Sequence, residues 1–277
     1  ALMQSNLLNL QVEEMLNEVR CNTLYAKKKL QSLVNQIIGL LQTSSELNGT
    51  ILSSAWAQKQ NLSVDGLENH DKMIMDEVTT IDYRLPSTVE CVGSFALETA
   101  IYPFVNIDLN VTMPSDMFDE RDILNHKYFH KRLLYLYGLK HILTKNGILT
   151  DERILSHEFG ILKGDIRKPI LIMQFDLKGY RIPIRIIPTI LPNTFKLVQL
   201  RLSKNNVRPK AWLENIEQSK KNKKKGVVFK QSSESDIVLF GTPHYNMAIL
   251  EDVVVKSQFN FMKQSVSNCP VAREAIL

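Results

Sequence analysis

The chain has 277 residues, of which 44% are hydrophobic and 23% are charged, a composition typical of a globular protein with a full core and one or two domains. No apolar run approaches the roughly twenty residues of a membrane-spanning helix, so no membrane partner is expected. The net charge of +5 is compatible with a nucleic-acid neighbourhood but does not establish one.

Residues 1–76 are predicted to form an N-terminal helical segment and a linker. Apolar residues recur at helical spacing from about Leu7 to Leu41, which predicts one long helix or two helices joined near Cys21. Between Thr43 and Glu77 the composition turns polar, which indicates a linker or extended wrap containing one helical turn. Because the apolar stripe is wider than a lone surface helix needs, packing of the helices on the rest of the chain is favoured over packing on a partner.

Residues 77–245 have the pattern of an α/β domain. The expected strands are Thr79–Arg84, Val89–Val92, Val105–Met113, Ile154–Lys163, Pro169–Phe175, Tyr180–Ile187 and Phe195–Leu202. The expected helices are Phe95–Ile101, a long amphipathic helix from Phe118 to Lys145, and a short helix around Trp212–Gln218. Pro183 places its strand at a sheet edge or a bulge. Residues 246–277 are predicted to be C-terminal helices.

The most informative motif is Gly93-Ser94, followed by Asn106-Ile107-Asp108. In nucleotidyltransferases a strand ends in Gly-Ser, a helix follows, and the next strand carries two acids two residues apart, which hold catalytic metals. Here the first acid is replaced by Asn106, whose amide supplies no negative charge. The Gly-Ser turn could retain a phosphate site at a helix N-terminus, or it could remain only because Gly fits the turn and Ser caps the helix. The second reading is favoured.

A third metal-binding acid is also missing from the expected position. The strand Tyr180–Ile187 contains no acid and offers Arg185 instead, while Asp176 lies before it in an Asp-Leu-Lys-Gly turn. A cation near a metal site repels the metal. The sequence therefore predicts a degenerate site, made of Gly93, Ser94, Asn106, Asp108 and Arg185, with no catalytic residue, no metal and no cofactor.

Other residues with metal-binding chemistry have simpler interpretations. His126 and His130 are four apart on the long helix, but without a third ligand this spacing more often marks a solvated or interface face. The cysteines Cys21, Cys91 and Cys269 show no CxxC spacing, so we expect buried or incidental thiols.

Basic residues form several groups that could meet RNA phosphates or simply face water. A lysine run could bind RNA, act as a nuclear localisation signal, or be a solvated loop; it comprises Lys220, Lys221, Lys223, Lys224 and Lys225. A second candidate RNA-binding stretch comprises Arg201, Lys204, Arg208 and Lys210. Four basic residues of the long helix could likewise face phosphate or water: Lys127, Lys131, Arg132 and Lys140. Aromatic residues interleaved with the lysine run, which would indicate base stacking, are missing.

Several segments together resemble the Nrap family, the nucleolar RNA-associated proteins of the small-subunit processome. The segments that carry this resemblance are Leu10–Arg20, Cys91–Pro114, Asp122–Arg132, Lys204–Arg208 and Gly241–Asn246. The resemblance implies an α+β fold: a nucleotidyltransferase-like palm, which is a mixed sheet with flanking helices, between long N-terminal helices and C-terminal helices. It also implies that the C-terminal helices, residues 246–277, lead into a helical domain beyond this chain.

The resemblance also implies a function, a location and a class of partner. The expected function is a non-catalytic scaffold in small-subunit pre-rRNA processing, in the nucleus and nucleolus, with other processome proteins and pre-rRNA as candidate partners. Two alternatives remain open, an active metal-dependent RNA nucleotidyltransferase and a simple basic RNA-binding module.

Overall fold

The computed structural model describes residues 2–19, 24–62, 79–101, 104–177, 179–207 and 244–268. Its α-helices are α1 (Leu2–Val19), α2 (Leu24–Thr43), α3 (Ser54–Lys59), α5 (Gly93–Ala96), α6 (Lys127–Lys145) and α9 (His244–Asn268). Its strands are β1 (Ile51–Leu52), β2 (Ile81–Asp82), β3 (Thr88–Val92), β4 (Ile107–Met113), β5 (Ile154–Leu162), β6 (Asp165–Leu177) and β7 (Tyr180–Ile190). Two short 3-10 helices are η1 (Ser115–Met117) and η2 (Leu197–Leu200).

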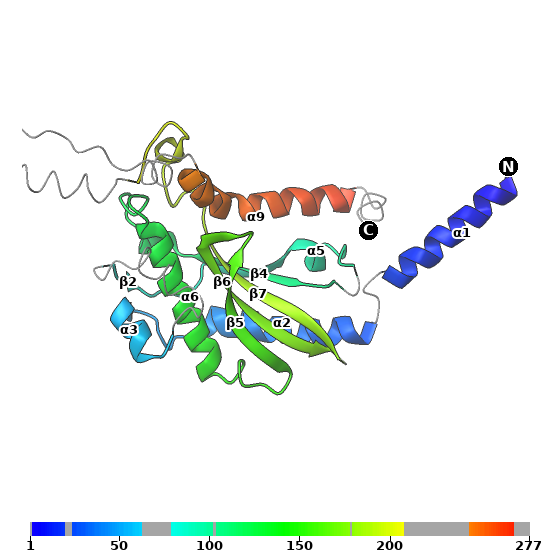
Figure 1. Ribbon diagram of the computed structural model, residues 1–277, viewed down its shortest axis with the longest axis horizontal. Helices are drawn as coiled ribbons and strands as arrows, with labels where there is room; N and C mark the ends of the chain where they lie inside the picture. The colour runs from blue at the N-terminus through cyan, green and yellow to red at the C-terminus, as the bar shows by residue number, and fades with distance from the viewer. Residues whose placement is uncertain are drawn as a thin grey trace, which may run out of the picture.

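A five-stranded mixed sheet organises the fold, with the strand order β3-β4-β7-β6-β5. Strands β4 and β7 run parallel, and the other neighbours run antiparallel. Figure 1 shows α2 and α6 on one side of the sheet and α9 on the other. The predicted α+β class, with a mixed sheet and flanking helices, is confirmed. None of the described helices is long and apolar enough to cross a membrane.

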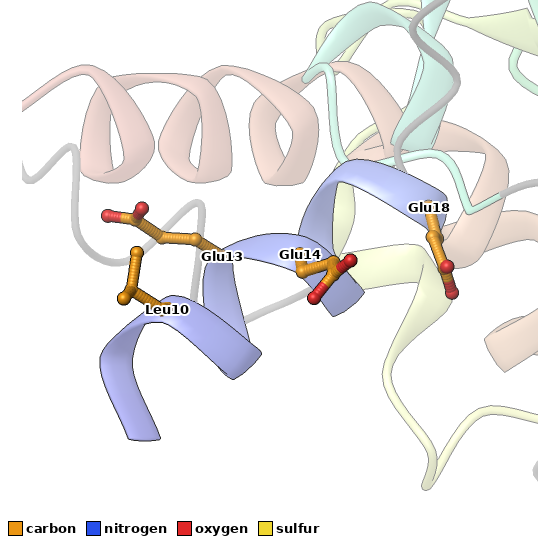
Figure 2. A pocket seen from close by; sticks show the side chains of 4 residues that line it. All are labelled: Leu10, Glu13, Glu14 and Glu18. Carbon is orange, nitrogen blue, oxygen red and sulfur yellow. The ribbon is translucent and has the colours of Figure 1, made fainter. Parts of the chain in front are cut away.

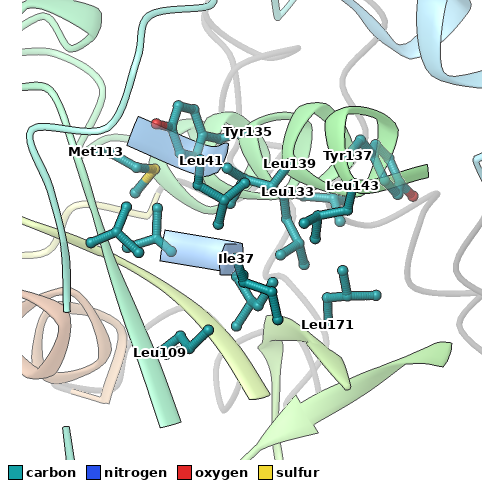
Figure 3. Close-up of a cluster of buried hydrophobic side chains, with 14 of the residues drawn as sticks. Ile37, Leu41, Leu109, Met113, Leu133, Tyr135, Tyr137, Leu139, Leu143 and Leu171 are labelled. Carbon is teal, nitrogen blue, oxygen red and sulfur yellow. The ribbon is translucent and has the colours of Figure 1, made fainter. Parts of the chain in front are cut away.

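The hydrophobic core lies between the sheet and the helices α2 and α6. Successive residues of a strand point to opposite faces, so Leu109, Val111 and Met113 of β4 all face this core and are fully buried. Figure 3 shows Ile37 and Leu41 of α2 beside a row of leucines and tyrosines from α6. The opposite face of the same strand carries Asp108, Asn110 and Thr112, and it is the face that holds the candidate site.

The N-terminal segment divides into a buried part and an exposed part. Leu30, Leu33 and Ile37 of α2 are fully buried, so the expected packing on the rest of the chain is confirmed for this helix. The expectation is wrong for α1, which extends away from the body in Figure 1 and leaves Leu8 and Met15 more than 60% exposed. The expected linker contains β1, which pairs with β2, and α3, whose N-terminus is capped by the Ser53 hydroxyl.

Three predicted elements differ from the structure. The long helix starts at Lys127 and not at Phe118, because Asn125 and His126 have left-handed backbone angles that a continuing α-helix excludes. The helix predicted at Phe95–Ile101 is the single turn α5, and the strand predicted at Phe195–Leu202 is the 3-10 turn η2. The short helix predicted around Trp212–Gln218 lies outside the described residues.

The position of Pro183 corrects a fourth expectation. Its strand, β7, lies inside the sheet between β4 and β6 and not at an edge. Pairing of β7 with β4 begins only at Ile184, so β4 does not extend to Pro183. Proline has no N–H to donate, but the pairing of β7 with β4 begins after this position and needs no N–H from it. The interior strand therefore tolerates Pro183.

A buried charge cluster joins α6, α9 and β6. Arg132 of α6 is fully buried, and its Nε donates to Asp252 Oδ2 of α9 at 3.0 Å, while Nη1 donates to the Pro169 carbonyl at 2.6 Å. The Tyr128 hydroxyl donates to the same Asp252 oxygen at 2.7 Å. The Lys168 ammonium, 1% exposed, lies 3.1 Å from Asp252 Oδ1. Asp252 thus pairs with both buried cations, Glu251 at 2.8 Å from Lys168 supplies the second negative charge, and the two acids hold α9 on the body of the domain.

This cluster predicts a large difference between two adjacent acids. Asp252→Ala would leave Arg132 buried without a counterion and Lys168 with Glu251 alone, so we expect a loss of about 3–5 kcal/mol in the free energy of unfolding. Glu251→Ala is the matched control, since Glu251 is half-exposed and its removal leaves Lys168 paired with Asp252. We expect it to cost no more than about 1 kcal/mol. Urea denaturation of both variants checks this, and equal losses would contradict the role given to Asp252.

Candidate functional site

The candidate site lies where β3, β4 and β7 come together on the sheet face that carries Asp108. The antiparallel register places Asp108 opposite Val92, the last residue of β3, and the parallel register places it opposite Arg185 of β7. Gly93 follows β3 directly, and Asn106 directly precedes β4. The structure therefore brings together the predicted residues Gly93, Asn106, Asp108 and Arg185.

Arg185 forms hydrogen bonds with both carboxylate oxygens of Asp108, the only acid that the motif retains. Its Nε donates to Asp108 Oδ1 at 2.5 Å and its Nη2 donates to Asp108 Oδ2 at 2.8 Å, a bidentate ion pair. The Asn106 amide nitrogen also donates to Asp108 Oδ2, at 3.2 Å. The Asp108 side chain is only 14% exposed. The cation of this site is thus supplied by the protein, and the Asn106 amide presents a donor where a metal requires an acceptor.

Gly93 is required by backbone geometry and by the closeness of Asp108. Its φ of +76° lies in the left-handed region, and a Cβ at this position would lie 3.0 Å from Asp108 Oδ2. The expected capping role of Ser94 is wrong, because Val92 is the N-cap of α5 and no side chain caps the helix. Since α5 has only four residues, it provides little of the dipole on which a phosphate site at a helix N-terminus depends.

The nearest acid on β6 does not complete a metal site. Asp176 pairs in register with Arg181, four residues before Arg185, and its Oδ1 accepts a hydrogen bond from the Gly179 N–H in the turn. Across the described segments, no group of three or more His, Cys, Asp or Glu side chains could hold a metal ion. Cys91 is half-buried, and burial, with a smaller effect of the Asp108 charge, raises the pKa of its thiol to about 11. Cys21 and Cys269 lie outside the described residues.

Polar side chains continue along the same sheet face beneath α9. Thr189 donates to Asn110 Oδ1 at 2.7 Å, and Thr88 donates to Thr112 Oγ1 at 3.0 Å. Lys256 of α9 reaches Thr88 at 3.3 Å and forms an ion pair with Glu90 at 3.1 Å. Phe259, farther along α9, packs on Val92 next to the candidate site. Sequence periodicity could not show that α9 lies on this face, because the polar strand residues read as solvent-facing.

The two histidines of α6 have structural environments. His126 is the N-cap residue of α6, and its ring packs edge-on against Tyr245 with 5.1 Å between the ring centroids. Burial, with a smaller effect of the Arg167 charge, lowers the pKa of His126 to about 4. His130 is 1% exposed within the helix. The solvated-face interpretation is therefore wrong, because both rings are partly or fully buried in the protein.

The structure separates the basic candidates into buried and exposed residues. Arg132 is buried in the cluster with Asp252, and Lys131 is paired with Asp122 at 2.6 Å, so neither is free to meet phosphate. Arg201 and Lys204 are exposed beside η2. Arg208, Lys210 and the lysine run (Lys220, Lys221, Lys223, Lys224 and Lys225) lie outside the described residues.

A separate hollow lies on α1 and has no catalytic arrangement. It is lined by Leu10, Glu13, Glu14 and Glu18, all from this one helix, as Figure 2 shows. The three carboxylates spread along consecutive turns and do not converge on a point. The hollow is therefore a surface feature of an exposed helix.

The geometry of the candidate site predicts how a metal site could be restored. In the double variant Asn106→Asp/Arg185→Ala, two carboxylates lie on one strand face without the competing guanidinium, as Mn²⁺ binding requires. We expect manganese to raise its thermal midpoint by about 2–4 °C for each kcal/mol of binding free energy. Asn106→Asp alone keeps Arg185 and should show no rise. An equal rise in the unmodified chain would contradict the competition between Arg185 and a metal.

The lowered pKa of His126 predicts a loss of stability in acid. The unfolded imidazole takes up a proton near pH 6.5, whereas the folded one does so only near pH 4, so stability falls as the pH decreases through this interval. His126→Asn tolerates the left-handed backbone and removes the titrating group, so its denaturation midpoint should fall less between pH 7 and pH 5. His157→Gln, at an exposed position of β5, is the control and should retain most of the acid sensitivity.

Comparison with known proteins identifies the family of the chain. A family model described as Nrap protein domain 1 matches residues 53–268. Nucleolar protein 6 of Xenopus laevis is 29% identical over 278 residues, covering 99% of this chain and 22% of that protein. The U3 small nucleolar RNA-associated protein 22 of Saccharomyces cerevisiae is 28% identical over 185 residues, covering 61% of this chain and 14% of that protein.

A solved structure, that of the GLD-2/RNP-8 complex, contains a chain with a TM-score of 0.37 and 11% identity, covering 66% of this chain and 39% of that one. This chain spans 22% of the length of the Xenopus and human nucleolar proteins that it matches. Because the family model covers most of its residues, the chain belongs to the Nrap protein domain 1 family.

Proposed function

We propose that this chain is a non-catalytic scaffold domain of a ribosome-biogenesis factor that acts in small-subunit pre-rRNA processing and assembly. Membership of the Nrap family supports the biological setting, as do relatives named as nucleolar and U3 small nucleolar RNA-associated proteins. The proposed location is the nucleus and nucleolus. The proposed partners are other processome proteins, with pre-rRNA as a second candidate ligand.

The ion pair between Arg185 and Asp108 is the observation that carries the non-catalytic part of the proposal. Nucleotidyl transfer by two metals needs converging carboxylates, each with free lone pairs. Asp108 uses both oxygens on Arg185 and has an amide, Asn106, in place of the second acid. A metal at this point would have to displace a bidentate cation and would gain a single carboxylate in return. The balance of charge therefore favours the ion pair over a bound metal.

The RNA-binding alternative rests on fewer described residues. Arg201 and Lys204 are exposed and could meet phosphates, whereas Arg132 and Lys131 are held in ion pairs. Among the described candidates, Lys127, Arg201 and Lys204 are exposed, and three cations supply only part of the counterion release of a tight RNA complex. We therefore place protein contacts first.

A nucleotide-incorporation assay tests the absence of catalysis. The purified chain is incubated with an RNA primer, ATP or UTP, and magnesium or manganese, beside an active poly(A) polymerase as the positive control. We expect no extension by the chain, and no change in Asp108→Ala. Primer extension that Asp108→Ala abolishes would overturn the proposal.

A second measurement separates a scaffold from an RNA-binding module. Affinity for a labelled pre-rRNA fragment is measured between about 50 and 200 mM salt, where several phosphate contacts would cause a steep fall. We expect weak binding, unchanged in Arg201→Ala/Lys204→Ala. A strong, salt-dependent affinity that this variant reduces would favour the RNA-binding module.

A further inference from the structure

Three distant segments interlock at the end of α9 that lies farthest from the candidate site. Asn206 Nδ2 donates to Asn246 Oδ1 at 2.8 Å and to the Gln199 carbonyl at 3.0 Å. Asn246 Nδ2 donates to the carbonyls of Arg201 at 2.9 Å and Lys204 at 2.7 Å. Both asparagines are buried, 8% and 2% exposed, so these bonds are shielded from water. They fix the backbone from η2 to Lys204 against the first turn of α9.

A third segment, the turn before α6, is tied to the same unit. The Asn125 N–H donates to the Asn206 carbonyl at 2.9 Å, and the Tyr245 hydroxyl donates to the Ile123 carbonyl at 2.8 Å. Tyr245 also accepts from the His126 N–H at 3.1 Å. The loop after β7 is therefore held from two sides, and the side chains that it presents to water stand on a fixed backbone.

This fixed unit presents four aliphatic side chains to solvent. Leu197, Val198 and Leu202 are 55%, 56% and 58% exposed, and Met247, next to Asn246 on α9, is 43% exposed. A single exposed apolar residue is ordinary, but four on one hydrogen-bonded unit are typical of an interaction surface. With Arg201 and Lys204 they define the η2 surface.

The cations of the η2 surface lack a counterion in the part of the chain that the structure describes. Arg201 and Lys204 are exposed and form no ion pair with a described residue. The nearby Lys196 is already paired with Glu120 at 2.5 Å, so that acid does not neutralise them. The surface thus combines an apolar centre with unneutralised positive charge beside it.

We propose that the η2 surface binds an acidic, amphipathic segment of a partner protein, with its apolar side chains on Leu197, Val198, Leu202 and Met247 and its carboxylates toward Arg201 and Lys204. Burying aliphatic side chains against the apolar side chains of a partner lowers the free energy of binding. Single-stranded RNA, in contrast, is typically bound by stacking of its bases on aromatic side chains. The η2 surface has no aromatic residue among the six that define it. This inference rests on the proposed scaffold function, because it names the chemistry of one protein contact.

Site-specific photo-crosslinking in cells tests the proposal on the whole chain. A benzophenone amino acid replaces Val198 or, as the control, Leu155, which is 50% exposed on β5, outside the η2 surface. We expect a nuclease-resistant protein adduct at Val198 that is missing at Leu155. The crosslinked partner peptide should carry apolar residues flanked by an excess of Asp and Glu. A synthetic copy should bind the purified chain about tenfold less tightly after Arg201→Glu/Lys204→Glu.

Each other result would overturn the proposal. These results are an RNA adduct at Val198, a yield no greater than at Leu155, a neutral or basic partner peptide, and binding that is unchanged by the charge reversal. The reversed residues are exposed, so an unchanged thermal midpoint shows that the variant remains folded. Failure here would leave the proposed scaffold function intact, because that function is tested separately by nucleotide incorporation.

Discussion

The bidentate ion pair between Arg185 and Asp108 determines the charge balance of the candidate site. A site that binds two catalytic metals must hold several carboxylates close together and relies on the metals to balance their repulsion. Here one carboxylate and one guanidinium from neighbouring parallel strands balance each other without an ion. Asn106 and Gly93 complete this arrangement, the first by donating to Asp108 and the second by leaving room beside it. The charge of Asp108 is thus balanced within the protein.

Helix α9 packs on the sheet face that carries the Arg185–Asp108 ion pair. At one end it is held by buried asparagines, in its middle by the charge cluster at Asp252, and toward its other end by Phe259 on Val92. Lys256 of α9 contacts Thr88 and Glu90 of β3, and Asn110 and Thr112 of β4 on the same sheet face are buried, so this part of the face is covered by the protein itself.

Much of the architecture could be predicted because the spacing of apolar residues in the sequence matches the residues that are buried in the folded chain. Alternation in β4, β6 and β7 follows the two faces of the sheet, and the helical spacing before Leu41 follows the buried stripe of α2. The predictions failed where the backbone conformation or the tertiary packing differs from what the local sequence pattern indicates. Asn125 and His126 stop a helical pattern by adopting left-handed angles, and Pro183 fits an interior strand because its neighbour β4 is shorter. The exposed α1 has the apolar spacing of a core helix without being one.

The sequence alone determined that a metal-binding acid is missing, because an amide at Asn106 and a cation at Arg185 are facts of residue chemistry. It also determined the α+β order of elements, since the periods of strands and helices differ. Only the tertiary structure decided that Arg185 meets Asp108 itself, that Arg132 is buried and not a phosphate contact, and that Asn206 and Asn246 join segments forty residues apart. Such pairings depend on strand register and helix placement, which arise from the packing of the whole chain and leave no local trace in the sequence.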